Sequence, residues 1–67
     1  MQYFYINDKK VFCNQAFNII DLVKFLHLDF DLIVIEYNKL ILPKQLWEKT
    51  FIKNQDEIEF VTIVGGG

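Results

Sequence analysis

The sequence contains no serine and no arginine, and it has only one cysteine, one histidine and one proline. Without serine, a Ser-His-Asp triad is impossible. Cys13 and His27 lie far apart in the sequence and fall short of the ligand set that a zinc site needs. A lone cysteine cannot form an internal disulfide, which favours a reducing compartment. Enzymatic machinery is therefore nearly absent, and we expect no bound metal.

Glycine is missing from the first 64 positions, so no glycine-rich phosphate-binding loop can form there. All seven basic residues are lysines and the net charge is −2, which argues against nucleic acid as a ligand. The longest apolar runs, such as residues 32–35, are far too short to span a membrane. The N-terminus has the pattern of a strand and not of a signal peptide. We therefore expect a cytoplasmic protein that binds neither nucleic acid nor membrane.

All three glycines are the last three residues, Gly65, Gly66 and Gly67. A glycine tail is thin and conformationally permissive because it has no Cβ atoms. Such a tail can enter the active site of another protein, where its terminal carboxylate can react. The alternatives are a frayed chain end or a scar left by cloning.

The chain is long enough for one small domain, whose stability is marginal unless its core is rich. Hydrophobic residues make up 52 % of the sequence and aromatic residues 16 %, which supplies such a core. Some of this apolar surface should remain exposed, and an exposed apolar patch on a small protein usually marks a partner surface.

Hydrophobic periodicity predicts five strands and one main helix. We expect strands over residues 2–6, 11–14, 33–38, 40–42 and 58–64, turns at 7–8 and 38–39, and a helical turn over 44–49. This order predicts an α+β fold, and a β-grasp roll satisfies it. Its mixed sheet would have four to five strands, with the first and last parallel at the centre and the helix across one face. Residues 1–64 would form this domain and residues 65–67 a flexible tail.

The helix should begin at Asn18, whose side chain can cap it, with Asp21 three residues further on. Its apolar face consists of Ile19, Leu22, Val23 and Leu26, and we expect Phe25 to widen that face. The helix should end at about His27 or Leu28. We expect His27 to be an ordinary helix-end residue and Cys13 a buried or half-buried strand residue.

Strand alternation suggests a docking surface beside the tail. If Ile58 and Phe60 face the helix, then Glu59, Val61 and Ile63 face outward. Apolar contacts there would give affinity and acidic groups would steer a basic partner. The alternative is that crystal or oligomer contacts alone cover this outward face.

The sequence resembles the sulfur carrier proteins of thiazole biosynthesis, the ThiS family. The resemblance covers nearly the whole chain and is carried by Asn7, residues 18–26, 34–38 and 42–44, Trp47, residues 56–61 and the tail 64–67. Three positions depart from the family pattern. Asp8 and Gln55 stand where glycine is usual, and Lys44 stands where arginine is common.

The resemblance implies a sulfur-carrying cycle at Gly67 and no enzymatic activity of the chain itself. A ThiF-like adenylyltransferase would use ATP to adenylate the Gly67 carboxylate, and sulfur from a persulfide made by a cysteine desulfurase would displace AMP. The resulting thiocarboxylate would give its sulfur to thiazole synthase. Gly65 and Gly66 would let the tail reach these active sites. We expect the carrier to bind no cofactor and to be a monomer when free.

Three other functions remain open at this stage. They are the small subunit of molybdopterin synthase, a ubiquitin-like protein modifier and a β-grasp interaction module with an incidental glycine tail. The family of the first usually has prolines before its tail, whereas the sole proline here is Pro43. The bias toward Ile, Phe, Lys and Asn suits an AT-rich genome, so we expect the bacterial cytosol or the plastid stroma.

Overall fold

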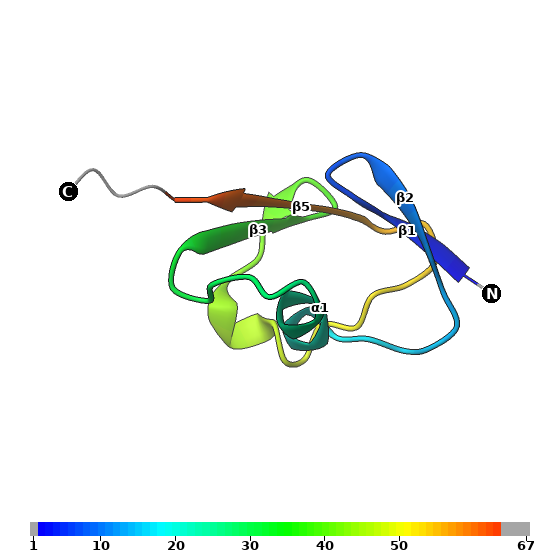
Figure 1. The fold of residues 1–67 in the computed structure, drawn as a ribbon, viewed down its shortest axis with the longest axis horizontal. Coiled ribbons are helices and arrows are strands. Elements are labelled where there is room, and N and C mark those ends of the chain that lie inside the picture. The colour runs from blue at the N-terminus through cyan, green and yellow to red at the C-terminus, as the bar shows by residue number, and fades with distance from the viewer. Residues whose placement is uncertain (1, 64–67) are drawn as a thin grey trace.

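The computed structural model describes residues 2–63 and shows one five-stranded mixed sheet with a helix on one face (Figure 1). Its elements are β1 (Gln2–Ile6), β2 (Lys9–Cys13), α1 (Ile19–Phe25), β3 (Ile33–Tyr37), β4 (Leu40–Ile41), the 3-10 helix η1 (Lys44–Leu46) and β5 (Glu57–Thr62). The strand order is β2-β1-β5-β3-β4. Strands β1 and β5 are parallel and the other neighbours are antiparallel, which confirms the predicted β-grasp arrangement.

Two tight turns close the hairpins β1–β2 and β3–β4. Asn7 and Asp8 have φ values of 47° and 70°, and Asn38 and Lys39 have 51° and 76°. Positive φ at both central residues defines a type I′ turn, whose twist matches that of the strands it joins. The first turn leaves Lys9 paired with Ile6, so β2 begins two residues earlier than predicted.

Both positions where the family usually has glycine adopt the left-handed conformation in this chain. Asp8 has φ 70° and Gln55 has φ 72°. A side chain at such a position costs about 1 kcal/mol relative to glycine, because its Cβ crowds the backbone. The sequence departures therefore keep the turn geometry and store a modest strain.

Helix α1 is closed at both ends by local hydrogen bonds. Asn18 Oδ1 accepts from the Asp21 N–H at 2.7 Å and Asp21 Oδ2 accepts from the Asn18 N–H at 3.2 Å, which confirms the predicted N-cap. At the other end, the His27 N–H donates to Lys24 O and the Leu28 N–H donates to Val23 O. This is a Schellman motif with His27 at φ 56°, so the helix ends at Phe25, two or three residues before the predicted end.

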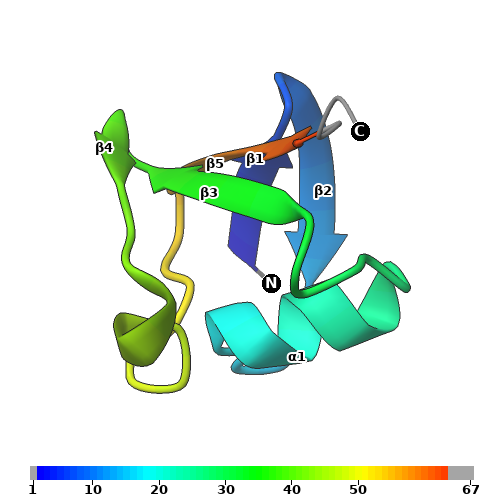
Figure 2. The same cartoon turned by 90° about the vertical axis from the view of Figure 1, so that its left-hand side faces the viewer.

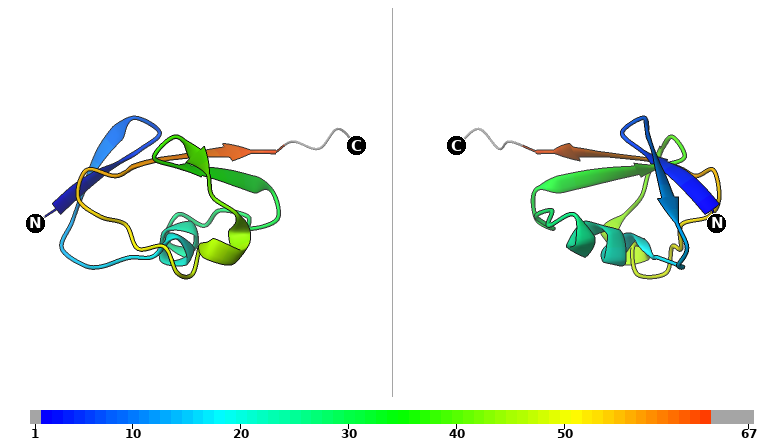
Figure 3. Two further views of the ribbon diagram at one scale, coloured as in Figure 1. Left: turned by 180° about the vertical axis from the view of Figure 1, so that it is seen from behind. Right: turned by 45° about the vertical axis from the view of Figure 1, so that its right-hand side comes forward.

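Helix α1 lies across one face of the sheet, as Figures 2 and 3 show from three directions, and the core lies between the two. Its buried side chains are Phe4, Ile19, Leu22, Val23, Ile33, Ile35, Trp47, Ile52 and Ile58. The expectation that Phe25 widens the buried face of the helix is wrong, because this side chain is 70 % exposed. With 3.6 residues per turn Phe25 falls on the flank of the helix, where its ring lies 6.4 Å from that of Phe17.

Four further elements have boundaries that differ from the predictions by a few residues. Strand β3 ends at Tyr37 because Asn38 already belongs to the turn, and β4 ends at Ile41. Strand β5 begins at Glu57, which pairs with Tyr5, and the described strand ends at Thr62. Only residues 44–46 of the predicted helical turn form a helix, and it is of the 3-10 type.

Candidate docking face and C-terminal tail

Strand β5 carries the chain through the middle of the sheet toward the glycine tail. Its first residues pair with β1, Tyr5 with Glu57 and Ile6 with Ile58, and residues 58–62 pair with β3. In Figure 1 the far end of β5 points away from β1 and β2. The predicted reactive residue Gly67 and its companions Gly65 and Gly66 lie outside the described residues, so their roles stay predictions.

The predicted docking residues lie on the outer side of β5. Ile58 is 1 % exposed and Phe60 packs against the core, whereas Val61 is 62 % exposed and Ile63 is 49 % exposed. Glu59 is half-buried on the same outer side. The structure therefore brings the three predicted residues together on one face, opposite the helix.

Cross-strand neighbours extend this surface. Val34 is opposite Val61, Glu36 is opposite Glu59, and Ile41 is opposite Glu36, so all of them share the outer side of the sheet. We call Val34, Glu36, Ile41, Glu59, Val61 and Ile63 the β5 face. Alternation within residues 33–37 could have placed Val34 and Glu36 outward, but only the strand register shows that they lie beside Glu59 and Val61.

The β5 face combines apolar side chains with uncompensated negative charge. Glu36 and Glu59 are a directly opposed like-charge pair, which is destabilising in an antiparallel sheet. Among residues 2–63 the one ion pair is that of Lys39 with Glu57, at 3.5 Å between two exposed side chains, and such pairs contribute little. The face therefore favours a partner that presents cations beside an apolar surface.

Asn7 extends the support of β5 beyond the end of β1. The Asn7 N–H donates to Ile58 O at 2.9 Å, and Asn7 Oδ1 accepts from the Phe60 N–H at 2.9 Å. The side-chain oxygen thus takes the place of a strand carbonyl. This bond holds the second half of β5 in place between the docking residues Glu59 and Val61.

A polar cluster fixes the start of β5. The buried carboxylate of Asp56 accepts from the Tyr37 hydroxyl, from Asn38 Nδ2 at 3.1 Å and from the Lys53 N–H at 2.7 Å. The Glu57 N–H donates to Asn38 Oδ1 at 2.8 Å. Burial raises the pKa of Tyr37 well above its usual range, and the hydrogen bond and charge of Asp56 raise it further. Asn38 and Asp56 therefore stabilise the fold at the start of β5.

Two other residues of the resemblance also have structural roles. Trp47 is fully buried, and its Nε1–H donates to Leu42 O at 3.0 Å. Pro43 precedes the 3-10 helix with φ −60°, a value to which its ring restricts it.

Cys13 is half-buried, as predicted. Within residues 2–63 no group of three or more His, Cys, Asp or Glu side chains could hold a metal ion, and no helix there could cross a membrane.

The fold defines a small ubiquitin-like protein of the β-grasp class. The structure resembles the crystal structure of the thiamine biosynthesis protein ThiS from Geobacter metallireducens, with a TM-score of 0.85, 23 % identity, and coverage of 98 % of this chain and 100 % of that chain. A solution structure of a thiamine biosynthesis protein from the same organism matches with a TM-score of 0.78, 23 % identity, and coverage of 98 % and 88 %. At these identities the likeness shows the fold.

Sequence comparison identifies the family. A model described as the ThiS family matches residues 2–67. The uncharacterized protein ycf40 of Trieres chinensis is 44 % identical, with 96 % of this chain and 88 % of the relative covered. The uncharacterized protein ycf40 of Porphyra purpurea is 37 % identical, with 92 % and 87 % covered. The chain therefore belongs to the ThiS family, the family of small sulfur carrier proteins that its sequence resembles.

Proposed function

We propose that this chain carries sulfur on its C-terminal residue and delivers it to thiazole synthase in thiamine biosynthesis. The observation that supports this proposal is membership of the ThiS family over residues 2–67, a match that includes the glycine tail. In this proposal the chain is a protein substrate and not an enzyme. It binds no cofactor of its own, and ATP belongs to the partner adenylyltransferase.

The proposed cycle exchanges one oxygen atom of Gly67 for sulfur. A carboxylate oxygen of Gly67 attacks the α-phosphorus of ATP, and pyrophosphate leaves. The terminal sulfur of a cysteine-derived persulfide then attacks the acyl carbon, a C–S bond forms, and AMP leaves with the C–O bond electrons. A second thiol cleaves the S–S bond, which leaves a thiocarboxylate on Gly67 and a disulfide on the donor side. Adenylation is needed because a free carboxylate is a poor electrophile.

The β5 face supplies the partner contacts in this proposal. Val61 and Ile63 provide exposed apolar contacts, and Glu59 with Glu36 provides negative charge. A ThiF-like adenylyltransferase and thiazole synthase would both approach this face, because it lies on the strand that leads to Gly65 and Gly66. Association with either enzyme should therefore slow as salt screens the charges.

The test is the intact mass of the protein after incubation with ATP, a persulfide source and a ThiF-like adenylyltransferase. We expect a mass increase equal to the replacement of one oxygen by sulfur, located at Gly67 by fragmentation. A matched variant with one alanine appended after Gly67 should show no increase. An unchanged mass with an adenylyltransferase that is active on another carrier would refute the proposal.

The thiocarboxylate product also distinguishes this proposal from the alternative that the chain is the small subunit of molybdopterin synthase. The thiocarboxylate form should support thiazole formation by thiazole synthase and should not replace the small subunit of molybdopterin synthase.

We also propose the plastid stroma as the compartment, because the ycf40 relatives are plastid-encoded. Analytical ultracentrifugation should show a monomer for the carrier alone.

A further inference from the structure

A second surface lies on the opposite side of the molecule from the end of β5. Strand β2, the loop that follows it and α1 enclose an apolar groove of about 460 Å³. Its lining includes Val11, Cys13, Phe17, Leu22, Phe25 and Leu26. We call this surface the β2–α1 groove. It shares no residue with the β5 face.

The groove runs beside an open sheet edge. Strand β2 is the outermost strand on its side of the sheet. The Tyr5 N–H donates to Asp56 O, directly before β5, and the Asn7 N–H donates to Ile58 O on β5. The main-chain groups of Phe4 and Ile6 therefore face β2. Phe4 pairs with Val11 and Ile6 with Lys9.

In an antiparallel ladder, the intervening residues of the outer strand direct their main-chain groups away from the sheet. The N–H and C=O groups of Lys10 and Phe12 therefore point outward. They form a template for one more strand.

The two edges of the sheet differ in what they can bind. At the other edge β4 has only two residues, which is too short to template a strand of ordinary length. Strand β2 has five residues, and an apolar groove lies directly beside it. A strand that added to β2 would place alternate side chains toward this groove. Strand β4 is too short to pair with an added strand over a comparable length.

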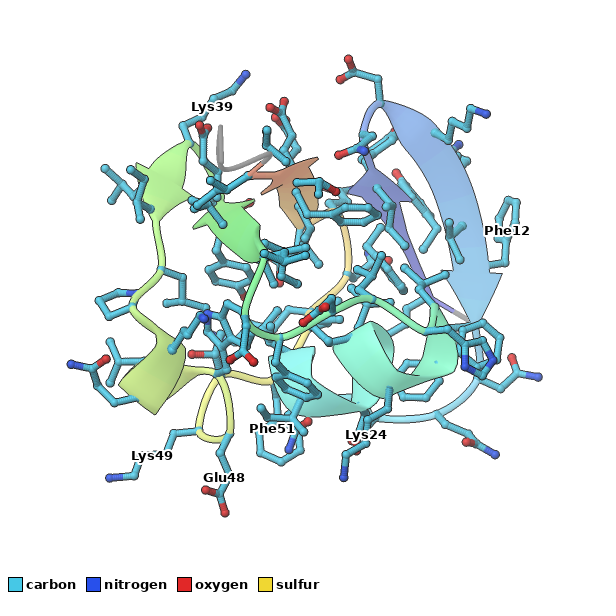
Figure 4. All side chains as sticks on the ribbon, turned by 60° about the vertical axis from the view of Figure 1, so that its left-hand side comes forward. Phe12, Lys24, Lys39, Glu48, Lys49 and Phe51 are labelled. Atoms are coloured by element: carbon cyan, nitrogen blue, oxygen red, sulfur yellow. The ribbon has the colours of Figure 1, made fainter. Side chains whose placement is uncertain are left out.

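Exposed aromatic rings flank the groove. Phe12 on β2 is 61 % exposed and Phe25 on α1 is 70 % exposed. Figure 4 shows Phe12 projecting outward from β2, while Lys24 projects from α1. Large exposed aromatics are costly in a free protein and are typical of binding surfaces.

The charge on this edge indicates the chemistry of its occupant. Lys9 and Lys10 are consecutive and exposed on β2. Within residues 2–63 neither has a carboxylate within ion-pair distance, although Lys10 Nζ lies 4.3 Å from the centre of the Tyr3 ring. Acidic residues beside an apolar strand would complement these lysines.

We propose that the β2–α1 groove binds an extended apolar segment of a partner protein, flanked by acidic residues, which adds to β2 as a sixth strand. Main-chain hydrogen bonds to Lys10 and Phe12 provide the alignment, and side chains in the groove provide the specificity. Strand β1 separates β2 from β5 in the sheet. A partner held here leaves the β5 face accessible to a second protein. The proposal does not depend on the chemistry at Gly67.

The test is an NMR titration of the ¹⁵N-labelled full chain with a synthetic peptide. The probe is the acetylated and amidated peptide Asp-Glu-Val-Ile-Val-Ile-Asp-Glu. We expect saturable shifts at the amides of Lys10, Phe12 and Phe25, and unchanged signals at Val61 and Ile63. Hydrogen exchange at the Lys10 and Phe12 amides should slow on binding.

Two controls separate strand addition from other modes of binding. A peptide with N-methyl groups on the alternate amides that face β2 keeps its side chains and should bind at least about tenfold more weakly. The variant Phe25→Glu should also bind about tenfold more weakly, whereas Leu40→Glu, at an exposed position on β4, should bind as the unmodified chain does.

Four results would overturn the proposal. They are the lack of saturable binding, equal binding of the methylated peptide, shifts confined to the β5 face, and shifts at Lys10 and Phe12 that depend on protein concentration without peptide. The last result would assign the edge to a second copy of the chain.

Discussion

Replacing Tyr37 by phenylalanine removes one hydroxyl group from the polar cluster at the start of β5. That hydroxyl donates to the buried Asp56 carboxylate and lies 3.3 Å from Phe51 O. Hydrogen bonds to a charged group contribute about 1.5–3 kcal/mol. Because the Tyr37 ring is only half-buried, we expect Tyr37→Phe to lower the free energy of unfolding by about 2 kcal/mol. For a chain of this length that is a large share of the total stability.

The pH dependence of this loss identifies its cause. The pKa of Tyr37 is raised in the folded protein, first by burial and then by its hydrogen bond to Asp56 and the charge of that carboxylate. Its stabilising contribution is therefore complete below the unfolded pKa of about 10 and is lost as the pH rises toward the folded value. Between the unfolded and folded pKa values the linkage slope is about 1.4 kcal/mol per pH unit, and solvent near the half-buried ring narrows the pH range over which it applies.

The assay is urea denaturation followed by circular dichroism from pH 7 to pH 11. The difference in unfolding free energy between the unmodified chain and Tyr37→Phe should be constant to about pH 9 and then shrink. Tyr5→Phe is the matched control, because the Tyr5 hydroxyl makes no hydrogen bond within residues 2–63. It should change the stability at pH 7 by less than about 0.5 kcal/mol. Parallel curves for the unmodified chain and Tyr37→Phe up to pH 11 would refute the role given to the Tyr37–Asp56 bond.

Three further substitutions test other parts of the structure. Gln55→Gly should raise the unfolding free energy by about 0.5 kcal/mol, because it relieves a positive φ but loses the bond from Gln55 Nε2 to the Tyr3 hydroxyl; a lower thermal midpoint would contradict this. Asn18→Ala should cost about 1 kcal/mol through loss of the helix cap, and unchanged denaturant unfolding would show that the cap contributes nothing. Val61→Asp should abolish adenylation of Gly67 while circular dichroism and unfolding stay unchanged, with the exposed Leu40→Asp as control, and normal adenylation would exclude a role for the β5 face.

The order of elements could be predicted because each one has a local signal. Asn18 and Asp21 predict the start of the helix, and the same two residues form the observed capping box. Asn7-Asp8 and Asn38-Lys39 mark the turns, and both adopt positive φ. Alternation along residues 57–63 was sufficient to place Val61 and Ile63 outward.

The features that sequence reasoning missed depend on contacts that are distant in the sequence or have no local signal. The helix ends early because His27 adopts the left-handed conformation at the position where glycine is usual. The histidine side chain gives no sequence signal for that conformation. Phe25 has the apolar character of a core residue but falls outside the sector of the helix that faces the sheet. The opposition of Glu36 to Glu59 follows from the register of β3 on β5, which alternation alone does not determine.

That like-charge pair is informative about what the folded part of the chain does. Directly opposed glutamates lower stability by a fraction of a kcal/mol, and a domain this small has little stability to spare. A glutamine at either position would remove the repulsion without changing the fold. A basic side chain of a partner that docked beside the exposed Val61 would neutralise these two carboxylates. The repulsion would then be relieved only in the complex, which explains why both charges are present. Binding of that partner would thus gain affinity from relief of the repulsion, separately from the chemistry that we propose at Gly67.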